Sequence, residues 1–336
     1  MSDQEDPGCR VRRDVQRERP AVTVALSRAG VTDLRRIISI QDGDKAELFY
    51  ATLDLFADLS PEQTGVHMSR FSEVVEDLAE GLTRTPFPDI ESLAKRMAEQ
   101  VMETQEGLRA EVRIKAQSPI VRTTPVTRRP TEELYTLIGI AAATRQRTRL
   151  LVGVEVNGLT VCPCAQGMVR EHAIDLLRED GYDEEESTRI VDRLPIASHN
   201  QRGRGTLMIG SEHRLRAEDL VDIAQRSMSS EIYELLKRPD ELYVVEKAHR
   251  NPRFVEDVVR EMLRNATERY ADLPGDTFVL ARQENFEGIH EHNAFAERFG
   301  TLDEIRPELA GEAYAVRHTS LADWLTGPAP GGPAGA

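Results

Sequence analysis

The spacing of apolar positions in the first part of the chain predicts strands separated by a pair of helices. Residues 46–60 and 108–125 alternate apolar and polar side chains, as strands with one solvated face do. Between them, residues 89–107 place Ile90, Leu93 and Met97 at helical spacing behind Asp89, a residue that favours a helix start. A shorter helical stretch covers residues 71–81.

The same order recurs in the second part of the chain. We expect strands over 133–144, 148–161, 203–216 and 276–290 and helices over 166–179, 183–194, 217–238 and 251–273. Strands and helices arrive in groups rather than in strict βαβ alternation. The pattern therefore predicts an α+β protein in which antiparallel sheets are covered by helices on one face.

Both ends of the chain differ from the part between them. Residues 1–20 are charged and poor in large apolar groups, and residues 327–336 are rich in glycine and proline, so we expect a disordered leader and a disordered tail. The folded part also lacks an apolar run of the roughly 18 residues that a membrane span needs. This and the absence of a signal-peptide core at the N-terminus predict a cytoplasmic protein.

The charge balance limits the partners that the surface can take. Lys+Arg 43 against Asp+Glu 58 gives a formal net charge of −15. A surface this acidic argues against nucleic acid or an anionic membrane as a partner. A ligand that carries phosphate must then be held by a local group of cations.

Two of the chain's three cysteines lie one residue apart, in the run GLTVCPCAQG. Cys162 and Cys164 fall between a predicted strand and a predicted helix, and the intervening Pro163 fixes the local backbone. A thiol at the start of a helix is well placed to bind a metal or to act as a nucleophile. The alternative is that both thiols are only small buried side chains. The spacing does not match the paired CxxC of structural zinc sites, so other metal ligands would have to be His or carboxylate.

Four of the eight histidines stand in motifs that suggest chemistry. His67 lies in GVHMSR, His199 in ASHNQRGRG, and His290 and His292 form the pair GIHEH. In a strand, His290 and His292 would point to the same side. A set of one cysteine, two histidines and a carboxylate suits a catalytic Fe, Zn or Mn site, although an HxH pair is also compatible with a solvated edge.

Two glutamates and two motifs that contain arginine complete the set of candidate site residues. Glu256 is flanked by apolar residues in FVEDVV, where a carboxylate is costly unless it is paired or faces a ligand, and it could accept hydrogens from the N1 and amino group of guanine. Glu241 is the second acidic residue of interest. Arg70 of HMSR and Arg202 of HNQRGRG could hold phosphates through bidentate contacts. A surface glutamate at a helix end is the alternative for Glu256.

The motifs together resemble the GTP cyclohydrolase IB family. They are GVHMSRF, LTVCPCAQ, SHNQRGRG, RPDELYVVEKAHRNPRFVEDVVR and ENFEGIHEHNAFAER, in this order over residues 65–298. CPCAQ and the long helical connection that follows it are similar to the archaeal branch. The resemblance implies a tunnelling fold (T-fold) with tandem ββαα modules at residues 21–128 and 129–326, closed into a barrel by homo-oligomerisation. A dimer or tetramer with shared active sites is implied.

The resemblance also implies roles for individual residues. The metal ligands implied are Cys162, His199, Glu241 and a histidine of the pair His290 and His292. The catalytic residues implied are Cys164, Cys162 and His290, and the substrate-binding residues are Glu256, His67, Arg70 and Arg202. In the last block the chain has Gly288 where the family commonly has serine, which changes local hydrogen bonding but keeps the histidines.

The reaction implied is the conversion of GTP to 7,8-dihydroneopterin 2′,3′-cyclic phosphate with release of formate and diphosphate. This is the first step of archaeal pterin synthesis, toward tetrahydromethanopterin or folate, and Fe(II) is the implied metal, with Zn or Mn as alternatives. Three alternatives stay open at this point: the bacterial product 7,8-dihydroneopterin triphosphate, a nitrile reductase of the same fold, and a non-catalytic protein with a structural metal.

Overall fold

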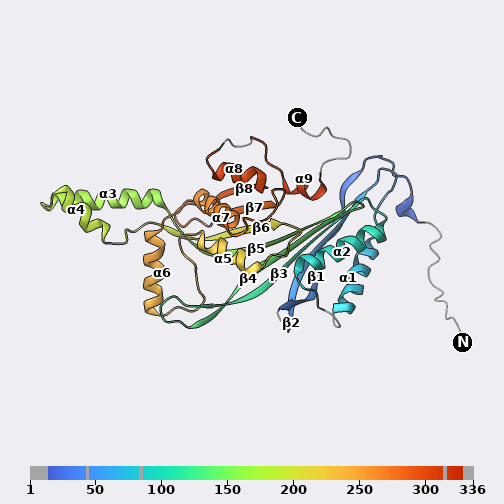
Figure 1. The fold of residues 1–336 in the computed structure, drawn as a ribbon, viewed down its shortest axis with the longest axis horizontal. Coiled ribbons are helices and arrows are strands. Elements are labelled where there is room, and N and C mark those ends of the chain that lie inside the picture. The colour runs from blue at the N-terminus through green and yellow to red at the C-terminus, as the bar shows by residue number, and fades with distance from the viewer. Residues whose placement is uncertain (1–13, 43–44, 83–85, 313–315, 328–336) are drawn as a thin grey trace.

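The computed structural model describes residues 14–42, 45–82, 86–312 and 316–327. In this part of the chain, one antiparallel sheet holds eight strands in sequence order, each paired with the next (Figure 1). The strands are β1 (Leu26–Asp42), β2 (Lys45–Leu59), β3 (Arg109–Thr123), β4 (Pro130–Thr144), β5 (Thr148–Val161), β6 (Asn200–Gly210), β7 (Phe278–Asn285) and β8 (Ala294–Thr301).

Most helices lie against one face of this sheet. The helices are α1 (Met68–Leu82), α2 (Ile90–Gln105), α3 (Pro163–Glu179), α4 (Glu184–Asp192), α5 (Ala217–Arg226), α6 (Arg238–Arg250), α7 (Val255–Arg269), α8 (Leu302–Leu309) and α9 (Leu321–Thr326). Helices α1, α2, α5 and α7 contact the strands, whereas α3 and α4 project from one end of the molecule (Figure 1). None of the described helices is long and apolar enough to cross a membrane.

Buried and exposed side chains alternate along the strands, so the two faces of the sheet differ in burial. In β3, Val112 and Ile114 are buried beneath the helices, while Arg113 between them points to the other face. Strand β4 is buried on both faces, because Ile138 and Ile140 pack against α9. The indole of Trp324 in α9 donates its Nε1–H to the carbonyl of Asp276 at 2.8 Å, which fixes α9 on this second face of the sheet.

The predicted tunnelling fold, with tandem modules and a barrel closed by oligomerisation, is wrong for this structure. Strands β3 and β4 pair without interruption from Arg109 opposite Thr144 to Thr123 opposite Pro130. The two halves of the chain therefore share one continuous sheet instead of forming a sheet each. The division at residues 128 and 129 falls in the turn between these strands, and the two domains stay a prediction.

Several predicted elements also end earlier than expected, and the strand expected over 203–216, for example, stops at Gly210. The helix expected over 217–238 stops at Arg226, and a separate helix α6 begins at Arg238. Ser227 and Ser229, which follow α5, are buried and bonded to neighbouring segments, so tertiary contacts end the helix there. The strand expected over 276–290 ends at Asn285, and the histidine pair follows in an irregular loop.

The predicted leader and tail are only partly covered by the structure. Residues 1–13 and 328–336 lie outside the described residues. Within the expected leader, Val15–Arg17 forms a short 3-10 helix, and Arg17 pairs with Glu106 at 2.7 Å.

Glu91 is a buried carboxyl in the first turn of α2, with 7% of its surface exposed. It lines a cavity of about 390 Å³ between the starts of α2 and α5. Burial, followed by repulsion from Asp89, raises the pKa of Glu91 to about 7. Its protonated form is therefore favoured in the folded state.

We expect Glu91→Gln to remove a pH-dependent loss of stability. Because the folded pKa lies above the unfolded value, the stability from Glu91 is fully present below pH 4.5 and is lost as pH rises through 7. The loss is about 3 kcal/mol at most. Urea unfolding at pH 5 and pH 8 checks this: the variant should gain stability only at pH 8. Glu103→Gln, an exposed position on the same helix, is the control, and equal pH dependence in wild type and Glu91→Gln would exclude Glu91 as the source.

Candidate active site

The cysteine pair lies at the junction of β5 and α3. Cys162 directly follows the last residue of β5 and caps α3, where its Sγ accepts a hydrogen bond from the amide of Ala165 at 3.5 Å. Pro163 occupies the first position of the helix, where its missing amide hydrogen has no cost. Cys162 is half-buried and Cys164 is exposed, so the second thiol is open to a substrate.

The chain leaves the sheet after β5, forms α3 and α4, and rejoins the sheet at β6 beside the point where it left. The amide of Cys162 donates to the carbonyl of His199 at 3.2 Å, and the hydroxyl of Ser198 donates to the carbonyl of Cys162 at 2.7 Å. The first cysteine and His199 are therefore neighbours, although the two projecting helices separate them in sequence (Figure 1).

Hydrogen bonds orient the ring of His199. Its Nδ1 lies 3.1 Å from Oε1 of Gln201, whose Nε2 donates to the hydroxyl of Thr160 at 3.1 Å. Because the amide nitrogen of Gln201 donates to Thr160, its oxygen faces Nδ1 of His199. An oxygen can only accept there, so this contact selects the His199 tautomer with hydrogen on Nδ1. Nε2 of His199 then keeps its lone pair for a metal or a substrate proton.

The histidine pair joins His199 from the loop after β7. His290 and His292 stack with ring centroids 5.1 Å apart, and His290 meets His199 edge-on at 6.1 Å. The two rings share a side, as predicted, but the loop and not a strand places them there. Both side chains are exposed. Three imidazoles thus form one group, and His199 of this group is bonded through its backbone to the first cysteine.

Glu287 is a site residue that sequence reasoning missed. Its side chain is 9% exposed, and its Oε2 lies 3.6 Å from Nδ1 of His199. This oxygen is buried and has no hydrogen-bond partner among the described residues. A buried carboxylate without a full set of partners is costly and is typical of functional sites. The signal in the sequence was its place three residues before His290, in ENFEGIH.

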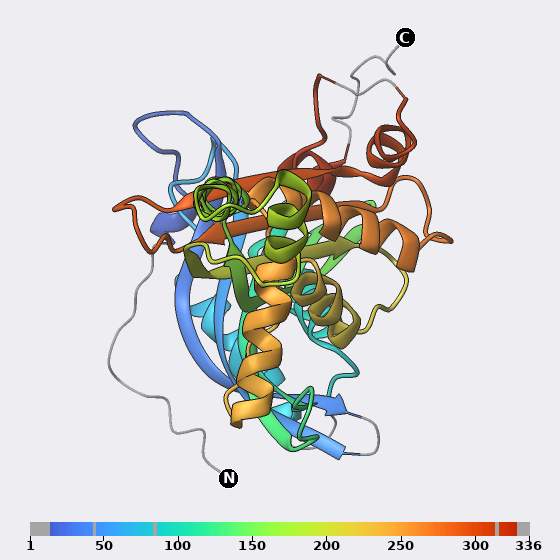
Figure 2. The same ribbon diagram turned by 90° about the vertical axis from the view of Figure 1, so that its left-hand side faces the viewer.

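Glu241 is not brought to this group within one chain. It is exposed in the first turn of α6, beside Asp240, which accepts hydrogen bonds from the amides of Val126 and Thr127. The opposite end of α6 lies at α3, where the carbonyl of His249 accepts from Gln166. Helix α6 thus spans from the β3–β4 turn to the base of α3, with Glu241 at the far end (Figure 2).

His67 and Arg70 lie at the other end of the molecule, at the start of α1 (Figure 1). Nε2 of His67 contacts the carboxylate of Asp14 at 3.1 Å, and Arg70 donates to the carbonyl of Thr104 at 2.6 Å. One chain therefore does not bring either residue to the cysteine pair.

The remaining substrate candidates are solvent-facing. Glu256 is exposed in the first turn of α7, so the expectation of a buried carboxylate there is wrong. It lines a groove of about 500 Å³ together with side chains of β8 and α8. Arg202 is exposed on β6, opposite Leu159 of β5. Both positions leave the polar groups free to meet a ligand from solvent.

The donor types at the cysteine pair suit a metal, but the predicted set is not assembled by one chain. Thiol, imidazole and carboxylate donors of Cys162, His199, His290 and Glu287 are those of Fe, Zn and Mn sites. Among the described residues, however, no group of three or more such side chains is placed to hold a metal ion. The orphaned oxygen of Glu287 marks where a further positive partner fits.

Comparison with known proteins identifies the family. The family described as "Type I GTP cyclohydrolase folE2" matches residues 13–296. The chain belongs to this family. The prediction of an enzyme that acts on GTP is thereby confirmed at the level of the family.

Named relatives agree with the family. The "GTP cyclohydrolase MptA" of Methanococcus aeolicus is 41% identical over 305 residues, which cover 88% of this chain and 99% of the relative. The MptA of Methanothermobacter thermautotrophicus is 41% identical over 304 residues, covering 88% and 95%. Among solved structures, the uricase of Arthrobacter globiformis aligns with a TM-score of 0.49 at 7% identity, covering 82% of this chain and 93% of that one.

We expect Glu287→Gln to lower kcat of this GTP cyclohydrolase by roughly 10²-fold, because the change keeps the shape but removes the charge beside His199. The measurement is the steady-state rate of formate release from GTP. Glu291→Gln, an exposed position between the two histidines, is the matched control and should retain the rate. Equal rates for both variants would exclude a role for Glu287.

Proposed function

We propose that this chain follows the archaeal branch of its family and converts GTP to 7,8-dihydroneopterin 2′,3′-cyclic phosphate, formate and diphosphate. The observation that carries this proposal is the backbone bond that joins the cysteine pair at the start of α3 to His199, whose ring contacts Glu287 and His290. Two facts support the archaeal branch. The relatives named above are MptA proteins of methanogens, and α3 and α4 form the long connection between CPC and HNQR.

Formate release requires water to add at C8 of the purine and protons to reach the nitrogens that leave. Cys164 is exposed at the second position of α3, where it can take a proton from the water that adds at C8 or give a proton to a ring nitrogen that leaves. The histidine of the His290–His292 pair that does not hold the metal is a further base. Glu287 places a carboxylate oxygen 3.6 Å from Nδ1 of His199, where it orients the ring and leaves the lone pair of Nε2 for the metal.

Substrate recognition falls to residues around this group. Glu256 accepts hydrogen bonds from N1 and the amino group of guanine, and its place in the first turn of α7 leaves it open to the base. Arg202 lies on β6 directly after Gln201 and is exposed to solvent, where it can hold a phosphate.

We propose Fe(II) as the cofactor, with Zn or Mn as alternatives, held by Cys162, His199 and a histidine of the His290–His292 pair. When bound, the metal supplies a Lewis acid that lowers the pKa of water. The fourth donor is Glu287 of the same chain or Glu241 of a second copy, since Glu241 lies at the far end of α6.

We further propose that two copies of the chain share each active site, in a dimer or tetramer. The support is the distance in the fold between the residues that the sequence groups together. His67 and Arg70 lie at the start of α1 and the cysteine pair lies at the start of α3, and these two helices lie toward opposite sides of the molecule along its long axis (Figure 1). A second copy can bring the two groups to one GTP.

The proposed reaction predicts which products are released. Anaerobically purified protein loaded with Fe(II) should release formate and diphosphate from GTP and form a cyclic phosphate, because Cys164 and the imidazoles carry the proton transfers. Cys164→Ala should lower the rate by at least roughly 10²-fold. Formate without diphosphate would assign the triphosphate product instead, and no formate from metal-loaded wild type would favour a structural metal.

An active site shared between two copies of the chain predicts that two inactive variants complement each other. Arg70→Ala and Cys164→Ala should each be inactive, but a mixture that is dissociated and reassociated should recover roughly a quarter of the wild-type rate, because a hybrid dimer contains one intact site. Formate release and mass photometry of the mixture check this. No recovery in a mixture with proven subunit exchange would show that each chain uses its own residues.

A further inference from the structure

The position of the cysteine pair cannot be set by burial of the helix that carries it. Helix α3 projects from the sheet and buries none of its residues. The residue before the pair, Val161, is by contrast fully buried at the end of β5. The contacts that hold the backbone of Val161 therefore add to the two hydrogen bonds that Cys162 itself makes with Ser198 and His199.

Both backbone polar groups of Val161 are hydrogen-bonded by segments outside the sheet. Its amide donates to the hydroxyl of Ser229 at 3.2 Å, and its carbonyl accepts from the amide of Arg253 at 3.0 Å. Ser229 belongs to the buried loop after α5, and Arg253 belongs to the turn between α6 and α7. Two segments far apart in sequence thus meet at the strand end that precedes the thiols.

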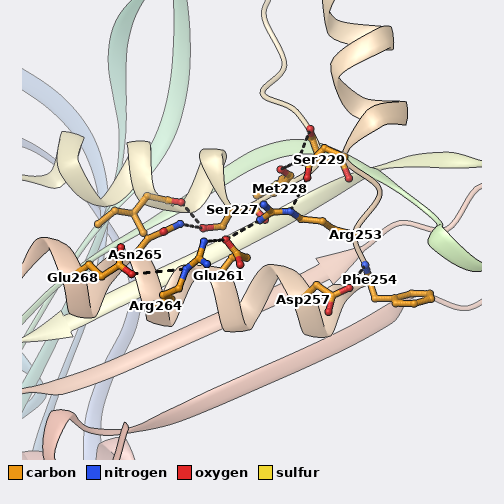
Figure 3. Close-up of polar contacts among 12 residues, drawn as sticks. Ser227, Met228, Ser229, Arg253, Phe254, Asp257, Glu261, Arg264, Asn265 and Glu268 are labelled. Atoms are coloured by element: carbon orange, nitrogen blue, oxygen red, sulfur yellow. Dashed lines mark hydrogen bonds and ion pairs between the residues drawn. The ribbon is translucent and has the colours of Figure 1, made fainter. Parts of the chain in front are cut away.

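The same two segments are tied to each other by side chains (Figure 3). Arg253 donates to the carbonyl of Ser227 at 2.8 Å, and the amide group of Asn251 donates to the carbonyls of Met228 and Ser229 at 3.3 and 3.2 Å. Three successive carbonyls of a buried loop are therefore satisfied by two side chains. Nε of Arg253 also donates to Oδ1 of Asn251 at 3.2 Å, which locks the two donors together.

We infer that Ser229, Asn251 and Arg253, here called the bracket, are positioning residues for the reaction. Glu256 lies three residues after Arg253, in the first turn of α7, and Cys162 directly follows Val161. The bracket therefore fixes the place of the thiols relative to the carboxylate that holds guanine. This inference rests on the proposed function, because the roles of Cys164 and Glu256 come from it.

The energetic reason is the cost of an unpaired buried backbone group. Ser227, Met228 and Ser229 are each at most 1% exposed, so their carbonyls cannot turn to water when a donor is lost. Loss of a donor moves the loop, and the loop carries the hydroxyl that holds Val161. A displacement of about 1 Å at a reacting group can cost roughly 10²-fold in rate.

Arg253→Gln tests the bracket, with Arg264→Gln as the matched control. Both arginines pair with Glu261, but Arg264 is the more exposed and makes no described contact with the buried loop (Figure 3). We expect kcat for formate release to fall roughly tenfold to a hundredfold in Arg253→Gln, with little change in KM, because the side chain does not touch GTP. Arg253→Lys should recover part of the rate, since its ammonium can still reach the carbonyl of Ser227.

Hydrogen–deuterium exchange supplies a readout that needs no activity. In Arg253→Gln, the peptide that contains Val161 and Cys162 should exchange faster, while peptides from α2 and β3 should not change. Ser229→Ala, which removes the acceptor of the Val161 amide, should give the same local signature. If the wild type releases no formate, the proposed function fails, and the exchange pattern still decides whether the bracket holds Val161.

Two results would overturn the inference. One is wild-type kcat and wild-type exchange at Val161 in both Arg253→Gln and Ser229→Ala. The other is a loss of activity with faster exchange over the whole molecule, which would assign the bracket to general stability.

Discussion

The site depends on the hydrogen bond between the amide of Cys162 and the carbonyl of His199. The chain leaves the sheet at the first of these residues and returns at the second, because β5 and β6 pair antiparallel to their ends. The projecting helices between them can therefore vary without moving either residue. A thiol and an imidazole distant in sequence are held together by backbone pairing.

Around this pair, partly satisfied polar groups indicate where chemistry takes place. Gln201 and Thr160 use their hydrogen bonds to set the ring of His199, whereas the buried oxygen of Glu287 has no hydrogen-bond partner in the described part of the chain. The carboxylate of Asp240, by contrast, accepts hydrogen bonds from the amides of Val126 and Thr127 and attaches α6 to the β3–β4 turn. The contrast separates a carboxylate available to a ligand from one that is used by the fold.

The continuous sheet explains why one chain holds only part of the expected set. Because β3 and β4 are paired throughout, the start of α1, which His67 precedes, and the start of α3, where the cysteines lie, are held apart by the width of the sheet. The candidate site residues that the sequence motifs group together are therefore held apart by a rigid sheet. This separation is the physical basis for the proposal of shared sites, whereas a flexible linker between two small sheets could have closed the gap.

The sequence by itself determined that the chain is a GTP cyclohydrolase and placed the strand-to-helix junction at Cys162, because these follow from motif order and local patterns. The side on which His290 and His292 lie is set by a loop and not by the expected strand. The sequence did not reveal the continuity of the sheet, since alternation within strands does not specify which strands pair. The end of α5 at Arg226, the exposure of Glu256 and the role of Glu287 were decided by contacts between distant segments. Burial and hydrogen-bond satisfaction are properties of the packed chain, so only the tertiary structure could supply them.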